Sequence, residues 1–239
     1  MPHRVLNVAE VAAYLHLTAP DVQRLMKDKE IPFEKQGDRI AFRRNEIDAW
    51  ASQRILAFSN KRLVDYHTSS SARVQAASSR QAIMPQFISA QWIDPGLASR
   101  TRASVIRDMV ALADKTQLVS DARELLQTIE ERERLCSTAL PGGFALLHPR
   151  HHDPYMFSES FMVLGRAVQP IHFNSPDGNP TDLFFLVCCQ DDRIHLHVLA
   201  RLCTMQQQTQ LLATLRAAGT ASEMLEVLIA AENEVTRHL

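Results

Sequence analysis

The sequence predicts an α/β (α+β) fold in two unequal units, and three observations lead to this prediction. From residue 84 onward, amphipathic helical patterns mix with short apolar strand patterns, which favours a sheet with flanking helices. The first 58 residues carry a pattern of their own. Between the two, the run YHTSSSARVQAASS from Tyr66 to Ser79 has few large apolar side chains, so burial cannot offset its ordering entropy. We therefore expect units at 1–58 and 84–239 and a linker at 59–83.

The first unit has the pattern of a small winged helix-turn-helix domain. Asn7 and Thr18 are predicted to cap two successive helices, and Gly37-Asp38 is a turn dipeptide between two short strands. A further helix is expected from Arg44 to Arg54. The second helix would lie in a DNA groove and the hairpin near the phosphates. The candidate DNA-binding residues are Gln23, Arg24, Lys27, Lys35, Arg39, Arg43 and Arg44.

The run VLNVAEVAAYLHLTAPDVQRLMKDKEIPFEKQGDRIAFRRNEIDAW resembles the excisionase-type, MerR-like helix-turn-helix family, which implies binding to duplex DNA. Charge agrees with this: residues 1–62 carry +3, and since the chain carries −1, the remainder carries −4. The family often has Arg, Ser or Thr where the second helix begins, whereas Ala19, Pro20 and Asp21 stand here. These side chains offer little base readout, so we expect modest affinity with a steep salt dependence.

The larger unit contains candidate chemistry but does not identify its own site. Helical patterns are predicted at 104–113, 121–132, 194–205, 207–218 and 221–235, and strands at 144–147, 161–164 and 183–187. Histidine can carry a transferable phosphoryl group, because imidazole is a good nucleophile near neutral pH and a good leaving group afterwards. The chain has ten histidines, and composition alone does not select one.

Two runs in this unit, RERLCSTALPGGFALLHPR and PIHFNSPDGNPTDLFFLVCCQDDRIHLHVLARL, resemble the type 2 enzyme IIA family of the phosphotransferase system (fructose, mannitol and nitrogen-related). The similarity extends from Met84 to about Glu234. It implies a mixed sheet with flanking helices and transfer from an HPr-like carrier to His148. It also implies that His195 is the second active-site histidine and that Arg132 holds the phosphate. Ser137 and Thr138 are candidate phosphate-binding residues, and His197 is interpreted as structural or as a secondary partner.

The sequence departs from that family around its central histidine. Leu147 stands where the family has proline, and Pro149 follows the histidine instead. Because proline has no N–H, a backbone donor near the phosphate is expected to be lost. Gly142-Gly143 also lies where the family separates its two glycines by one residue.

Other classes of protein fit the sequence poorly. Cys136, Cys188, Cys189 and Cys203 show no C-x-x-C spacing, so we interpret them as reduced thiols of a cytoplasmic protein. Adjacent histidines such as His151-His152 rarely chelate one ion, so we expect no metal, and no cofactor is expected. The apolar run from Leu183 to Cys189 is too short to span a bilayer, and the amino-terminal residues show no secretory signal.

The combination favours a DNA-binding regulator that carries a phosphorylatable histidine, because neither a sugar-specific membrane module nor a IIB module is present in the sequence. Two alternatives stay open. One is a phosphocarrier of sugar uptake whose front unit docks a protein, and the other is a degenerate domain that only binds partners. We also hypothesise a homodimer, because a weak helix-turn-helix gains affinity when two half-sites are linked.

Overall fold

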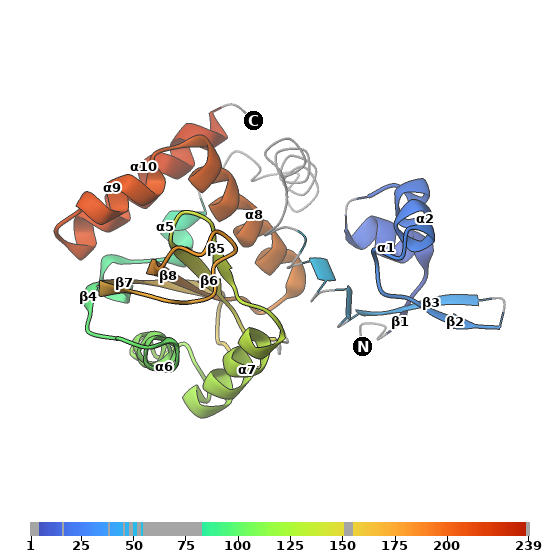
Figure 1. The fold of residues 1–239 in the computed structure, drawn as a ribbon, viewed down its shortest axis with the longest axis horizontal. Helices are drawn as coiled ribbons and strands as arrows, with labels where there is room; N and C mark the ends of the chain where they lie inside the picture. The colour runs from blue at the N-terminus through green and yellow to red at the C-terminus, as the bar shows by residue number, and fades with distance from the viewer. Residues whose placement is uncertain are drawn as a thin grey trace.

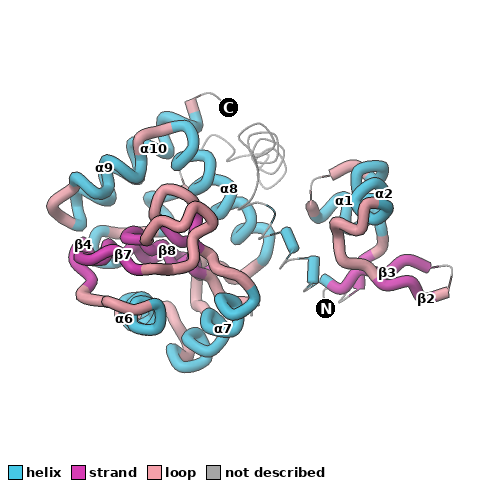
Figure 2. The backbone as a smooth tube through the Cα atoms, viewed as in Figure 1, coloured by secondary structure: helices cyan, strands magenta, loops and turns pink. Residues whose placement is uncertain are grey.

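The computed structural model describes residues 5–15, 17–37, 39–44, 46–47, 50–51, 54, 83–150 and 155–237. Figure 1 shows the elements in chain order, and Figure 2 separates helices, strands and loops. Apart from Ile83, the predicted linker at 59–83 lies outside the described residues, as do His151 and His152. No helix among the described residues combines the length and apolar character needed to cross a membrane.

The amino-terminal part has the predicted helix, turn, helix and hairpin. Its elements are β1 (Val5–Leu6), α1 (Val8–Tyr14), α2 (Ala19–Lys27), β2 (Glu34–Gln36) and β3 (Arg39–Arg43). Both predicted caps are present, since the Glu10 amide donates to Asn7 Oδ1 at 2.9 Å and the Asp21 amide donates to Thr18 Oγ1 at 3.3 Å. The strands lie in the order β1-β3-β2, and the described residues between 44 and 54 are helical.

A small core holds these elements together. Val11, Val22, Phe42 and Ile47 are completely buried, so each helix and the hairpin contribute one side chain. The indole N–H of Trp50 donates to the carbonyl of Glu30, which ties the last helix to the chain that leaves α2. The prediction for this part is therefore confirmed in the described residues.

The carboxy-terminal part is a mixed sheet between two layers of helices. Its elements are α5 (Met84–Phe87), η1 (Ala90–Trp92), β4 (Ile93–Leu97), α6 (Arg102–Asp114), α7 (Ala122–Leu135), β5 (Ala139–Leu140), β6 (Phe144–Leu147), β7 (Phe161–Ile171), β8 (Thr181–Cys188), α8 (Asp192–Gln208), α9 (Leu211–Ala217) and α10 (Ala221–Thr236). The strand order is β4-β7-β8-β6-β5. The pairs β4/β7 and β6/β8 are parallel, whereas β7/β8 and β5/β6 are antiparallel. Helices α6 and α7 cover one face, and α8 to α10 cover the other (Figure 1).

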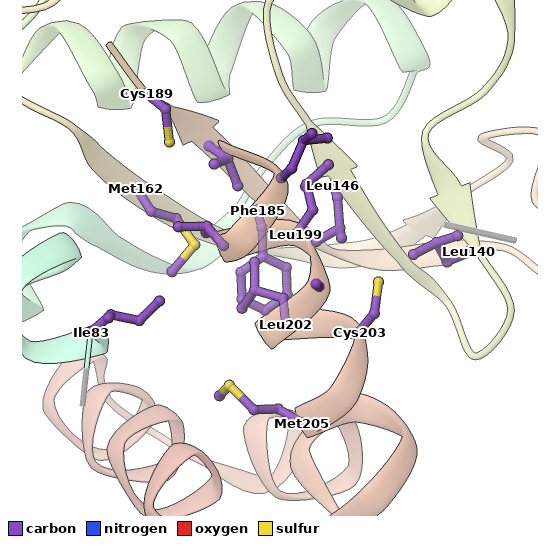
Figure 3. Packing of buried hydrophobic residues seen from close by; sticks show 14 of the residues in the cluster. Ile83, Leu140, Leu146, Met162, Phe185, Cys189, Leu199, Leu202, Cys203 and Met205 are labelled. Carbon is purple, nitrogen blue, oxygen red and sulfur yellow. The ribbon is translucent and has the colours of Figure 1, made fainter. Parts of the chain in front are cut away.

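Alternation along the central strands divides the core into two layers. On β6, Phe144 and Leu146 pack in the layer of α8 to α10, whereas Ala145 and Leu147 pack in the layer of α6 and α7. Figure 3 shows Leu146 and Phe185 beside side chains of α8 in the first layer. Leu146 pairs with Phe185 and Leu147 with Leu186, so β6 and the parallel β8 run together toward one edge of the sheet. The next residue after β6 is His148.

Several features of this part differ from the predicted pattern or add to it. The short helices α5 and η1 were not predicted, and β7 continues to Ile171 instead of ending at residue 164. Strand β4 was not predicted, because Pro95 and Gly96 interrupt its apolar run, and such residues are tolerated at an edge strand. The short β5 was also missed. The predicted break between the helices at 194–205 and 207–218 was placed too early, since α8 continues to Gln208 and α9 begins only at Leu211.

A buried ion pair fixes the beginning of this part to its last helix. Arg201 Nη1 lies 3.0 Å from Glu232 Oε1, and both side chains are fully buried. Glu232 also accepts the amides of Ile83 and Met84 at 2.9 and 2.8 Å. Burial raises the pKa of Glu232 and lowers the pKa of Arg201, so each charged form carries a desolvation cost that its partners offset.

We predict that Glu232→Ala lowers the free energy of unfolding by about 3–5 kcal/mol, because it leaves a buried guanidinium and two amides without their acceptor. Urea unfolding followed by circular dichroism measures the change. Glu226→Ala is the matched control, since Glu226 is exposed on the same helix, and it should change stability by less than about 0.5 kcal/mol. Equal effects of the two substitutions would contradict the role of the buried pair.

Candidate functional site

Two histidines meet where β6 and β8 end. His148 directly follows β6, and His195 lies in the first turn of α8, which begins four residues after the last residue of β8. Because β6 and β8 are parallel neighbours, these two positions come to the same edge of the sheet. The ring centroids of His148 and His195 are 4.7 Å apart, with an angle of 48° between the ring planes. The pair is therefore in direct contact.

Arg132 reaches this pair from the last turn of α7. Its Nε donates to His148 Nε2 at 3.0 Å, and its Nη1 donates to the carbonyl of Cys136 at 3.1 Å. The Arg132 side chain is only 2% exposed. A guanidinium stays protonated in proteins, so the site contains a fixed positive charge next to the imidazole.

The other ring nitrogen of His148 is also engaged. Its Nδ1 lies 2.8 Å from the carbonyl oxygen of Leu146. His148 and His195 are 2% and 1% exposed, so the site is almost closed to solvent. An imidazole held from both sides beside a buried cation can accept an anionic group and can stabilise it there.

The predicted Ser-Thr pair lies in the turn after α7, but both hydroxyl protons are used within the fold. Thr138 Oγ1 donates to Glu133 Oε2 at 2.7 Å, and the Thr138 amide lies 3.1 Å from the same carboxylate. The Ser137 hydroxyl donates to the carbonyl of Phe173. Glu133 is itself paired with Arg102 at 2.8 Å. In this structure Ser137 and Thr138 hold the turn that carries the carbonyl bound by Arg132.

His197 was interpreted as structural or as a secondary partner of the site. It is 7% exposed and lies two residues after His195 on α8, so the two rings leave the helix in different directions. The ring in contact with His148 is that of His195.

Sequence reasoning missed three groups that shape the site. The carbonyl of Leu146 contacts His148, the carboxylate of Glu133 holds Thr138, and the backbone and sulfur of Cys136 contact Arg132. The sequence does not reveal which backbone carbonyls act as acceptors. The Cys136 side chain could have been found, because it lies four residues after Arg132, a spacing at which side chains at a helix end can meet.

The candidate DNA-binding residues fall into two groups by their surroundings. Gln23, Arg24 and Lys27 are exposed on α2, and Lys35, Arg39 and Arg43 are exposed on the hairpin. Two of them are paired with carboxylates, because Arg24 lies 2.9 Å from Asp21 and Arg43 lies 2.7 Å from Glu34. Arg44 is half-buried, with its guanidinium 5.2 Å from the centre of the Tyr14 ring. The hairpin and α2 thus present Lys27, Lys35 and Arg39 most openly.

Comparison with known proteins gives two family matches and several relatives. Residues 86–231 match the family described as "Phosphoenolpyruvate-dependent sugar phosphotransferase system, EIIA 2", and residues 5–55 match the family "Helix-turn-helix domain". A "Nitrogen regulatory protein" of Bradyrhizobium diazoefficiens is 27% identical over 59% of this chain and 92% of its own length. A "PTS system fructose-specific EIIABC component" of Bacillus subtilis is 23% identical over 60% of this chain, but the match spans only 22% of that protein.

Solved structures agree with the fold of the carboxy-terminal part. The nitrogen regulatory protein IIA-Ntr from Neisseria meningitidis has a TM-score of 0.56 at 22% identity, covering 62% of this chain and 99% of that one. IIA mannitol from Escherichia coli has a TM-score of 0.53 at 20% identity, covering 59% and 98%. Together with the family match, these results show that the chain belongs to the EIIA 2 family of the phosphoenolpyruvate-dependent sugar phosphotransferase system and carries a helix-turn-helix domain before the EIIA domain.

Proposed function

We propose that this protein is a DNA-binding regulator whose EIIA domain accepts a phosphoryl group on His148 from an HPr-type carrier. One observation carries the proposal. His148 Nε2 lies 3.0 Å from the buried guanidinium of Arg132, while Nδ1 is held 2.8 Å from the carbonyl of Leu146. A nucleophilic nitrogen and a cation that can hold the incoming phosphate are thus already side by side.

The hydrogen bonds of His148 support Nε2 as the reacting ring nitrogen. A carbonyl oxygen can only accept, so His148 Nδ1 carries the proton and donates it to Leu146. Nε2 then keeps its lone pair, which accepts the Arg132 N–H. During transfer, Nε2 forms the new bond to phosphorus, and the bond from phosphorus to the carrier breaks with its electron pair returning to the carrier.

Arg132 has a second role after the bond is made. The phosphorylated ring is cationic and the phosphoryl group is anionic, and the guanidinium can move its hydrogen bond from Nε2 to the phosphoryl oxygens. Charge-assisted hydrogen bonds of this kind contribute about 1.5–3 kcal/mol each. The ring keeps its proton on Nδ1, so Leu146 continues to fix its orientation and no proton has to leave the ring.

The near-complete burial of the site supports a second candidate function. His148 is 2% exposed, so a carrier reaches Nε2 only if neighbouring groups move aside. Pro149, which has no N–H, removes a backbone donor beside the histidine. Both observations favour a domain that binds partners without phosphoryl transfer, and labelling of His148 separates the two functions.

The partners we propose follow from the two family matches. A solved complex pairs "enzyme IIAMTL and phosphorylated enzyme IIBMTL" of Escherichia coli, and the IIA chain there has a TM-score of 0.53 to this chain at 19% identity. By analogy, we infer that a protein carrying a phosphoryl group docks over His148.

Duplex DNA is the proposed ligand of the helix-turn-helix domain, with Lys27, Lys35 and Arg39 as the main phosphate contacts. Arg24 and Arg43 can also contact phosphate when they exchange their exposed carboxylate partners for it. We also propose that the protein forms a homodimer and that its two domains span residues 1–58 and 84–239.

We predict that Nε2 of His148 is the unprotonated ring nitrogen in the unphosphorylated protein. Two-bond ¹⁵N–¹H spectra distinguish the two tautomers directly. His172 is exposed and serves as an internal comparison, for which a mixture of tautomers is expected. A spectrum in which His148 is protonated on Nε2 would be incompatible with the assigned nucleophile.

We further predict that His148→Ala abolishes phosphoryl transfer from phosphoenolpyruvate through enzyme I and an HPr-type carrier. His195→Ala should slow transfer by at least about tenfold, because its ring contacts His148 and the variant would remove one hydrogen-bond donor that we propose for the incoming phosphoryl group. His197→Ala is the matched control on the same helix and should transfer at nearly the original rate. Labelling that persists in His148→Ala, or equal rates for the two α8 variants, would count against these roles.

For the DNA-binding domain, we predict that Arg39→Ala weakens binding to all duplex sequences alike and lowers the slope of log affinity against log salt by about one. The reason is that an exposed hairpin arginine contacts phosphate rather than base edges. Arg107→Ala removes the same charge from an exposed position of the EIIA domain and should leave both quantities unchanged. Affinity that ignores salt between low and physiological ionic strength would reject this interface.

A further inference from the structure

Cys136 differs from the other cysteines of the chain in being accessible. It directly follows α7 and is exposed, whereas Cys188, Cys189 and Cys203 are buried. Burial raises the pKa of Cys203 to about 12 and raises the pKa of Cys188 well above its usual value. Cys188 and Cys203 are therefore shielded and held protonated, Cys189 is buried, and Cys136 is the thiol that a reagent in solution can reach.

The sulfur of Cys136 lies against the buried guanidinium of the candidate site. Arg132 Nη1 donates to Cys136 Sγ at 3.4 Å in addition to its bond to the Cys136 carbonyl. Arg132 Nη2 has no hydrogen-bond partner within the described ranges, although the side chain is 98% buried. The terminal nitrogens of a guanidinium form a fork of N–H donors, so the sulfur lies next to an unused cationic donor. An oxygen atom added to the sulfur would supply the missing acceptor.

We propose that Cys136 is a peroxide-sensitive thiol and that its oxidation to sulfenic acid impairs the phosphoryl acceptor site. The sulfur attacks one oxygen of hydrogen peroxide, so that an S–O bond forms and the O–O bond breaks. The leaving hydroxide takes the thiol proton and becomes water. Sulfur is oxidised, peroxide is reduced, and no other reactant is needed. Excess thiol reverses the change through a mixed disulfide.

The same guanidinium connects this sulfur to His148. Nε holds His148 Nε2 at 3.0 Å while Nη1 reaches Cys136, and the group is rigid and planar. Drawing Nη1 and Nη2 toward a new sulfur-bound oxygen therefore displaces Nε from the imidazole. The added oxygen also competes with an incoming phosphoryl group for the same donors. This second half of the inference rests on the proposed role of His148, whereas the oxidation itself does not.

The first test concerns the oxidation and uses the full-length protein. Reduced protein is treated with hydrogen peroxide in the presence of dimedone, which traps sulfenic acids, and the adduct is mapped by mass spectrometry. We expect one adduct, at Cys136, and none in Cys136→Ser, whereas Cys203→Ser should be labelled like the original protein. Arg132→Lys keeps the charge but removes the fork, and it should be labelled more slowly. Absence of the Cys136 adduct, or equal labelling in Arg132→Lys, would overturn the assignment.

The second test concerns the connection to His148. In the original protein, oxidation should reduce the rate of phosphoryl transfer by roughly tenfold or more, the size of one charge-assisted hydrogen bond. The ratio of oxidised to reduced rates should be one in Cys136→Ser. The ¹⁵N signal of His148 Nε2 provides a readout that needs no transfer, and it should shift on oxidation in the original protein only. If the reduced protein transfers no phosphate, the proposed function fails, while an unmoved Nε2 signal would refute the connection.

Discussion

The hydrogen bond from Arg132 to His148 is the interaction on which the arrangement of the site depends. It joins the end of α7 to the end of β6, two segments that approach the same edge of the sheet from different layers. A buried guanidinium cannot lose its proton and must find acceptors, so its position is strongly restricted. The turn after α7 provides one acceptor for Arg132, the carbonyl of Cys136. Glu133 stabilises that turn by accepting the hydroxyl of Thr138.

In this arrangement the buried cation has no neutralising carboxylate among the residues that hydrogen-bond to it in the described structure. Its acceptors are an imidazole nitrogen, a carbonyl and a thiol. Glu133 is next to it in sequence but points to Arg102 and the turn instead. Among the described residues, no carboxylate hydrogen-bonds to this guanidinium beside His148, an arrangement that suits the anionic group of the proposed function.

The sequence was sufficient for the parts of this fold that have strong local signals. The Asn7 and Thr18 caps, the hairpin at Gly37 and the apolar strands at 144–147 and 183–187 were predicted and are present. Family resemblance selected His148, His195 and Arg132 from many candidates, and the structure brings the three together.

Other features depend on tertiary contacts and had no local signal. Strand β4 contains Pro95 and Gly96, and only its pairing with β7 makes it a strand. Ser137 and Thr138 were predicted as candidate phosphate-binding residues, and the structure adds that their hydroxyls donate to Phe173 and Glu133, neighbours that the sequence alone does not reveal. Composition does not contain that information.

The contact of Glu232 with Ile83 and Met84 has a consequence for how such a domain can be combined with others. The segment where the chain enters the EIIA domain is held against its final helix, so entry and exit lie beside each other. A domain with adjacent ends can be placed between two halves of a host protein, or attached at either end, with little demand on connector length. The geometry of this fold therefore allows the domain to be combined with other domains. The fully buried carboxylate of Glu232 holds the first and last segments of the domain together.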